Sequence, residues 1–140
     1  MRAAARGVLA LALTAACSRG APDNTAGDVA DRFVDMYIVE IDQARALPLT
    51  TGTAARRIQE ELDQTAGVRS TGYSAELAKP TVYYERTSLK EEAGGARAVY
   101  DIRIKHATGE ERRHVLVSLH NREGGAWKVA GFFLQDGPAR

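Results

Sequence analysis

The sequence is poor in several features, and each absence narrows the class of protein. Cys17 is the only cysteine among 140 residues, so no internal disulfide can form. Lysine plus arginine number 19 and aspartate plus glutamate 18, and the two signs alternate without the basic stripe that a nucleic-acid partner needs. No internal repeat or low-complexity tract occurs. The composition therefore predicts one ordinary globular domain and no nucleic-acid partner.

The N-terminal residues 1–17, MRAAARGVLALALTAAC, have the layout of a secretory signal peptide. Arg2 and Arg6 give a positive start, and an apolar run over residues 7–16 ends in small residues. A membrane-spanning helix needs about 20 apolar residues, roughly twice the length of this run. We therefore predict that residues 1–16 are a signal peptide and not a spanning helix.

Residues 13–17, LTAAC, resemble the lipobox of bacterial lipoproteins. The resemblance implies that the Cys17 sulfur receives a diacylglyceryl group and that cleavage before Cys17 makes it the new N-terminus. The sequence departs from the family at Thr14, where leucine is usual and Leu13 stands one place too early. Ordinary cleavage leaving a free thiol is the alternative, but a lone thiol is a liability in an oxidising compartment. Ser18 resembles the pattern of Gram-negative lipoproteins sent to the outer membrane.

Residues 17–27 are predicted to be a lipidated cysteine and a flexible tether, and residues 28–140 a single domain. The stretch after Cys17, SRGAPDNTAG, is small, polar and interrupted by proline and glycine, as is typical of a linker. No polybasic block lies beside it, so electrostatic docking on anionic lipid is not predicted. The rest of the chain is long enough to bury a core without disulfides or a metal.

A first helix is expected at the start of the domain. Thr25 and Asp28 form the Ser/Thr-x-x-acid pattern of a helix start. Apolar residues then recur at spacings of three and four, and Pro48 predicts an end near residue 47. The apolar stripe is Phe33, Val34, Tyr37, Ile38, Ile41 and Ala44.

A second, shorter helix follows. Thr51 or Thr53 is its predicted cap, and it is expected to run to residue 65 and to stop at Gly67. Residues 74–79 are long enough for one further helical turn.

From residue 81 the pattern changes to four strand-like runs, 81–90, 96–106, 111–120 and 126–135. Turn signals that contain glycine separate the runs, at 92–95, 108–109 and 123–125. This order of elements predicts an α+β fold: two or three N-terminal helices packed on one face of a curved four-stranded antiparallel meander.

The register of the middle hairpin is predicted from a turn centred on residues 108–109. This register pairs Tyr100 with Val117 and puts apolar and charged side chains on opposite faces of the hairpin. A one-residue slip would bury the charged side chains, so this register is favoured. The apolar face then holds Ala98, Tyr100, Ile102, Ile104, Val115, Val117 and Leu119.

The sequence constrains the registers of the first and last hairpins less tightly. A five-residue first turn adds Val82 and Tyr84 to the apolar face. For the last hairpin two alternatives stay open. An even loop turns Ala130, Phe132 and Leu134 inward, and an odd loop turns Trp127, Val129 and Phe133 inward.

This arrangement resembles the nuclear-transport-factor-like cone fold, which ketosteroid isomerase and many small binding domains share. Three features over about residues 28–136 carry the resemblance: the first-helix stripe through Phe33, Tyr37 and Ile41, the shorter second helix, and the closing strand 125–132 (GAWKVAGF). The resemblance implies a pocket between the first helix and the sheet. The candidate pocket-lining residues are Tyr37, Tyr84 and Tyr100, each with an apolar ring and a hydroxyl that needs a partner when buried. Core residues with satisfied hydroxyls are the alternative.

The residues predict no catalytic group, no cofactor and no metal. A ketosteroid-isomerase-like enzyme needs a carboxylate base beside hydroxyl donors in an apolar cavity, whereas Asp42 and Asp101 fall on the polar sides of their elements. His114 and His120 lie about 20 Å apart on one strand, too far for one ion to bridge them. His106 belongs to the opposite face.

We therefore expect a membrane-anchored lipoprotein, which the resemblance at Ser18 places in the outer membrane, facing the periplasm. Its non-catalytic domain is expected to bind a partner protein or a small apolar ligand. A small cofactor-independent isomerase or dehydratase that uses the same cavity is the alternative.

Overall fold

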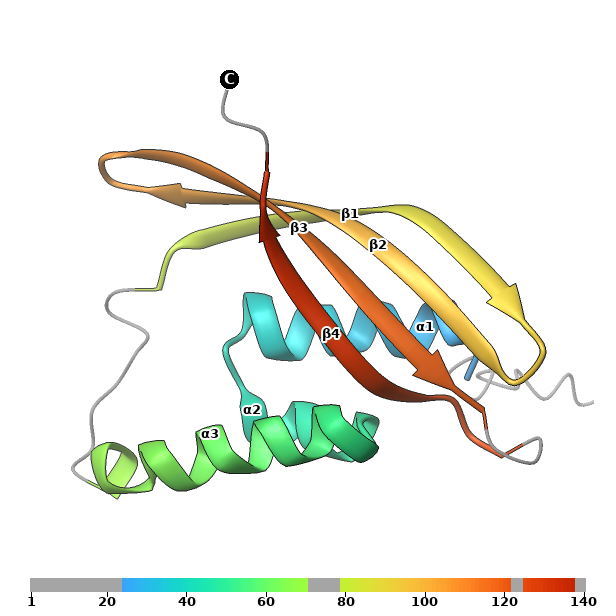
Figure 1. Cartoon of the computed structure of the whole chain (residues 1–140). Coiled ribbons are helices and arrows are strands. Elements are labelled where there is room, and N and C mark those ends of the chain that lie inside the picture. The colour runs from blue at the N-terminus through green and yellow to red at the C-terminus, as the bar shows by residue number, and fades with distance from the viewer. Residues whose placement is uncertain (1–23, 71–78, 122–124, 138–140) are drawn as a thin grey trace, which may run out of the picture.

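The computed structural model describes residues 24–70, 79–121 and 125–137, in which helices lie beneath a four-stranded sheet (Figure 1). The predicted signal peptide, Cys17 and nearly all of the helical turn expected at 74–79 lie outside these residues. The helical elements are α1 Ala26–Val34, the π-helix η1 Asp35–Val39, α2 Gln43–Ala46, the 3-10 helix η2 Leu47–Leu49 and α3 Gly52–Ser70. The strands are β1 Thr81–Glu92, β2 Gly95–His106, β3 Gly109–His120 and β4 Lys128–Asp136.

Helix α1 begins where the sequence pattern predicts. The Thr25 hydroxyl accepts a hydrogen bond from the Asp28 amide at 3.2 Å, and the Asp28 carboxylate accepts one from the Thr25 amide at 3.3 Å. This capping box gives partners to two amides near the helix N-terminus. Val29, Phe33 and Val34 are buried on the face that contacts the sheet.

The first helix does not run unbroken to residue 47, so the prediction of one long helix is wrong. It passes into η1, where the Glu40 amide donates to the Asp35 carbonyl at 2.8 Å. Ile41 then has a left-handed backbone, with φ of 55°, and its side chain is 42% exposed. The Asp42 carboxylate accepts a hydrogen bond from the Arg45 amide at 3.0 Å and so starts α2. A local cap thus competes with helix continuation, and apolar spacing does not reveal that competition.

Helix α3 begins at Gly52, directly after the predicted cap Thr51. It packs on β4, and its Ile58 side chain is fully buried. The helix continues past Gly67 to Ser70, so the predicted stop at Gly67 is wrong. A glycine inside a helix costs only about 1 kcal/mol, which one long helix packed on the sheet can absorb.

The four strands form an antiparallel meander in the order β1-β2-β3-β4, as predicted. All the helices lie on one face of this sheet (Figure 1), with α1 in contact with all four strands and α3 in contact with β4. The α+β architecture expected from the order of elements is therefore confirmed.

The middle hairpin pairs two residues away from the predicted register. His106 pairs with Gly109 across a two-residue turn, so Tyr100 lies opposite Val115 and not opposite Val117. A shift of two keeps each side chain on its face, because strand side chains alternate with a period of two. The predicted inner face is therefore confirmed although its pairing was wrong, and its residues are buried or half-buried: Ala98, Tyr100, Ile102, Ile104, Val115, Val117 and Leu119.

A bulge in β1 replaces the predicted five-residue turn of the first hairpin. Glu92 pairs with Gly95 across a two-residue turn, and the register shifts by one residue between Arg86 and Ser88. Beyond the bulge, Tyr84 lies opposite Ile102 and therefore shares its face, as predicted.

A second bulge, in β4, reconciles the two alternatives for the last hairpin. The register shifts where β4 passes Ser118 and Leu119, so Val129 lies opposite Leu119 and Phe132 lies opposite Val117. Both Val129 and Phe132 are buried, although they stand three residues apart. One extra residue in a strand interrupts the alternation, and neither a plain even loop nor a plain odd loop gives this result.

Candidate functional site

The candidate site is a hollow of about 880 Å³ at the end of the sheet where β1 begins, β2 ends and β3 begins. Strand alternation divides its lining between the two faces of the sheet. On the inner face are Val82, Tyr84, Ile102 and Arg113, joined by Asp35 and Val39 of η1. On the outer face are Tyr83, Glu85, Asp101, Arg103, Arg112 and His114. The lining of this β1–β3 hollow thus includes residues of both faces, and the hollow differs from an enclosed pocket between α1 and the sheet.

Tyr84 is the predicted tyrosine that lines the hollow. Its side chain is 37% exposed, and its ring meets the Tyr100 ring edge-on with centroids 6.1 Å apart. Partial burial, followed by the negative charges of Asp35 and Asp31, raises the pKa of the Tyr84 hydroxyl. Tyr84 therefore offers the hollow a neutral hydroxyl on an apolar ring.

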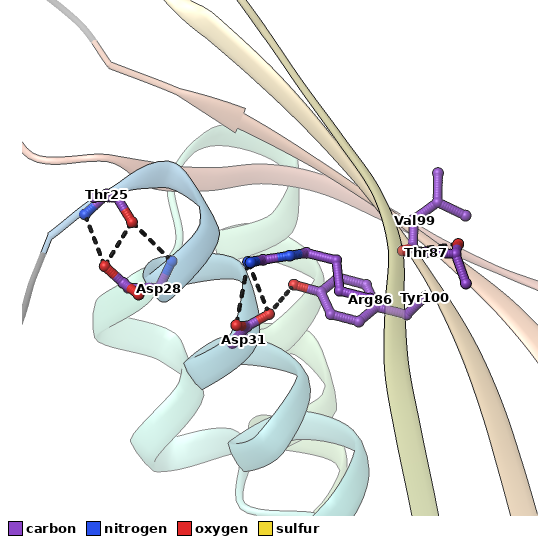
Figure 2. Close-up of polar contacts among 7 residues, drawn as sticks. All are labelled: Thr25, Asp28, Asp31, Arg86, Thr87, Val99 and Tyr100. Atoms are coloured by element: carbon purple, nitrogen blue, oxygen red, sulfur yellow. Dashed lines mark hydrogen bonds and ion pairs between the residues drawn. The ribbon is translucent and has the colours of Figure 1, made fainter.

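Tyr100 is fully buried and is not among the lining residues. Its hydroxyl donates a hydrogen bond of 2.6 Å to Asp31 of α1, and the same carboxylate accepts both contacts of the Arg86 guanidinium at 3.1 Å (Figure 2). Burial, and then this hydrogen bond to a carboxylate, raises the pKa of Tyr100. The three side chains tie α1 to β1 and β2.

Gly27 makes room for this connection. In Figure 2 the Arg86 side chain reaches from β1 across to Asp31 on α1. A side-chain carbon at Gly27 would collide with the Arg86 guanidinium. The bare backbone at this position therefore lets the arginine lie against the first turn of α1.

Tyr37 also has a satisfied hydroxyl and lies outside the hollow lining. It donates to both carboxylate oxygens of Glu61 on α3, at 2.8 and 2.9 Å, and Arg57 pairs with the same carboxylate at 3.3 Å. The Tyr37 ring stacks on Phe33 at 5.3 Å and meets Phe132 edge-on at 4.8 Å. Burial, and then the Glu61 contact, raises the pKa of Tyr37. This second connection ties η1 to α3.

The two connections limit what the site can do chemically. An isomerase of the ketosteroid type needs hydroxyl protons and a carboxylate that are free to meet a substrate in a dry cavity. The hydroxyls of Tyr37 and Tyr100 already donate to carboxylates, and each carboxylate is also paired with an arginine. Ligand contact by these two tyrosines stays a prediction, and their visible role is to fix the helices on the sheet.

The three histidines lie as strand alternation predicts. His114 of the outer face contacts Asp101 at 2.7 Å, whereas His106 of the inner face approaches Glu111 at 3.5 Å. Across residues 24–70, 79–121 and 125–137, no group of three metal-ligating side chains comes together. In the same part of the chain, no helix is both long and apolar enough to cross a membrane.

Sequence reasoning missed most of the lining. Tyr83, Arg103, Arg112 and Asp35 line the hollow but are not among the predicted pocket-lining residues. A signal for Tyr83 was present, because two adjacent tyrosines in one strand must face opposite sides. The pairing of Arg103 with Arg112 depends on the true register, which the apolar pattern leaves open by two residues.

Comparisons with known proteins assign no family to this chain. No protein-family model matches the chain, and no curated protein matches it. A solved chain described as a "2.5 Angstrom structure of from Catenulispora Acidiphila" is similar, with a TM-score of 0.48 and 12% sequence identity. The similarity covers 79% of this chain and 87% of that chain.

Proposed function

We propose that this chain is a lipoprotein anchored to the outer membrane through Cys17, with a non-catalytic domain that faces the periplasm. In this proposal the domain binds a partner protein or a small apolar ligand on the inner face of the β1–β3 hollow. The resemblance to cone-fold binding domains and to the lipobox supports it.

One observation carries the binding half of the proposal: partly exposed apolar side chains of β1 and η1 line the hollow. Val82 is half-buried and Tyr84 is 37% exposed, and both line the open space together with Val39. Apolar surface left in water is unfavourable, and contiguous exposed patches of it commonly mark binding sites. An apolar group placed here would remove that surface from water.

Tyr84→Ser tests this site. We expect an uncharged fluorescent probe, N-phenyl-1-naphthylamine, to bind the full chain and the substitution to weaken binding about tenfold. Burial of a large apolar side chain is worth about 1.5–3 kcal/mol, and each 1.4 kcal/mol corresponds to a factor of about ten. Fluorescence titration measures the change.

Leu89→Ser is the matched control. Leu89 lies on the same strand and has the same exposed fraction as Tyr84, 37%, but does not line the hollow. Probe binding should therefore be unchanged in this variant. Equal weakening in both variants, or none in Tyr84→Ser, would contradict binding in the hollow.

Cys17→Ser tests the anchor. We expect the wild-type chain to sediment with membranes and the variant to move to the soluble fraction, because the hydroxyl cannot take the thioether-linked lipid. Two acyl chains give stable anchoring where one alone is marginal. Ser18→Ala is the control and should stay with the membrane. Mass spectrometry that finds a free thiol on Cys17 of the wild-type chain would overturn the anchor.

One observation supports the alternative that this chain is an isomerase or dehydratase. Asp35 lines the inner hollow close enough to Tyr84 for its charge to raise the Tyr84 pKa. A carboxylate base beside a hydroxyl donor is the pair that an isomerase requires. Exchange of solvent deuterium into a bound ketone that is lost in Asp35→Asn would favour the enzyme over the binding domain.

A further inference from the structure

A separate group of side chains lies on the outer face of the sheet at the β1–β3 hollow. Arg103 of β2 lies directly opposite Tyr83 of β1 and directly opposite Arg112 of β3. The Arg103 guanidinium carbon lies 5.6 Å, and the Lys105 ammonium nitrogen 5.2 Å, from the centroid of the Tyr83 ring. These four residues, Tyr83, Arg103, Lys105 and Arg112, are termed the outer cationic cluster.

The positive charges of this cluster are compensated only in part, because Glu110 of β3 lies directly opposite Lys105 and leaves two of the three charges unbalanced. Like charges directly opposite each other on neighbouring strands are destabilising. Within the described part of the chain, Arg103 and Lys105 form no ion pair, and Arg112 has a single exposed contact with Glu110 at 3.4 Å. Glu85 and Asp101 occupy the next row, where Asp101 is held by His114 at 2.7 Å.

We propose that the outer cationic cluster binds the phosphate group of an anionic ligand. Side chains directly opposite on neighbouring strands start about 4.5–5.5 Å apart, so the Arg103 and Arg112 guanidinium groups can donate to oxygens of one tetrahedral anion. Both arginines line the hollow, which leaves space for that anion. The bound charge relieves the repulsion between them.

The chemistry of the cluster selects phosphate over a carboxylate. The three cations and the neighbouring Glu110 leave two positive charges, which match a dianion better than a monoanion. A phosphate also offers more acceptor oxygens than a carboxylate to two planar guanidinium groups. The ring of Tyr83 is 46% exposed beside this position and offers an apolar face to the organic part of the ligand. The site uses the face opposite to the proposed apolar site, so either can fail without the other.

Titration of the full chain in an uncharged detergent with inorganic phosphate tests the proposal. We expect saturable shifts of the Arg103 and Arg112 side-chain N–H resonances, and binding weakened about tenfold or more in Arg103→Gln. The loss of one charge-assisted hydrogen bond gives an effect of this size. Arg103→Lys should bind with intermediate affinity, because it keeps the charge and loses the fork of donors.

Arg97→Gln is the matched control. Arg97 lies on the same strand and face as Arg103 and also stands opposite a cation, Lys90, but it lies outside the hollow. Its substitution should leave phosphate affinity unchanged. Equal affinity in wild type and Arg103→Gln, or acetate binding as tightly as phosphate at matched ionic strength, would overturn the proposal.

The source of the phosphate is a separate arm of the same experiment. The Cys17→Ser chain is mixed with phosphatidylcholine vesicles that contain or lack phosphatidic acid. Flotation that needs both phosphatidic acid and Arg103 assigns the phosphate to a lipid headgroup. Binding of inorganic phosphate without flotation assigns it to a soluble ligand.

Discussion

Phe33→Ala should lower the free energy of unfolding by about 3–5 kcal/mol, the usual cost of removing a buried phenylalanine. Phe33 is fully buried on α1, where its ring stacks on Tyr37 at 5.3 Å and meets Phe132 of β4 at 5.1 Å. The substitution therefore opens a cavity where α1, η1 and β4 converge. Domains of this size have total stabilities of only about 5–15 kcal/mol. Urea unfolding followed by circular dichroism measures the loss.

Phe133→Ala is the control for this prediction. Phe133 is the neighbour of Phe132 on β4, but its side chain is 66% exposed on the other face. Its substitution should change the unfolding free energy by no more than about 0.5 kcal/mol. A similar loss in both variants would mean that Phe33 and its ring contacts do not form the centre of the core.

The sequence predicts best what depends on near neighbours. The start of α1 rests on Thr25 and Asp28, three residues apart, and the inner face of the sheet rests on alternation within single strands. The break at Ile41 is also local, but it depends on whether Asp42 caps a new helix or stays inside the old one. Apolar spacing is compatible with both outcomes.

The alternation of apolar and polar residues along single strands does not reveal which residues meet at the candidate site. The register of the middle hairpin is degenerate by two residues, yet only the true register places Arg103 opposite Arg112. Tyr84 lies on the inner face beside Tyr100 as predicted, but through a two-residue turn and the β1 bulge and not through a five-residue turn. Each depends on backbone geometry at a turn or a bulge, which short-range patterns constrain weakly.

The side-chain contacts that hold the helices on the sheet join residues that lie even further apart in the sequence. Asp31 meets Arg86 across 55 residues and Tyr100 across 69. The sequence did carry a signal, because Arg86 and Tyr84 are two residues apart and an arginine on an apolar face needs an acid. The polar stripe of α1 could not reveal which of its acids was the partner, since Asp28, Asp31 and Asp35 all fall in it.

The raised pKa of the Tyr100 hydroxyl predicts that the folded chain loses stability at alkaline pH. Burial and the hydrogen bond to Asp31 raise its pKa in the folded state above the ordinary value of about 10. A group whose folded pKa is raised contributes stability that is fully present below its unfolded pKa and lost as the pH rises. Above pH ~10 the unfolding free energy should therefore fall, with Tyr100 contributing about 1 kcal/mol per pH unit. Tyr37, whose pKa is also raised, acts in the same direction.

Tyr100→Phe separates this effect from general alkaline unfolding. At neutral pH it should lower the unfolding free energy by about 1.5–3 kcal/mol, because a hydrogen bond to a charged carboxylate is lost. Above pH ~10 its stability should fall less steeply than that of the wild-type chain. Tyr83→Phe is the comparison, because its ring is 46% exposed and its hydroxyl has no hydrogen bond in the described part of the chain. Urea unfolding across this pH range measures both slopes, and equal slopes in Tyr100→Phe and wild type would show that the bond to Asp31 does not hold the Tyr100 proton.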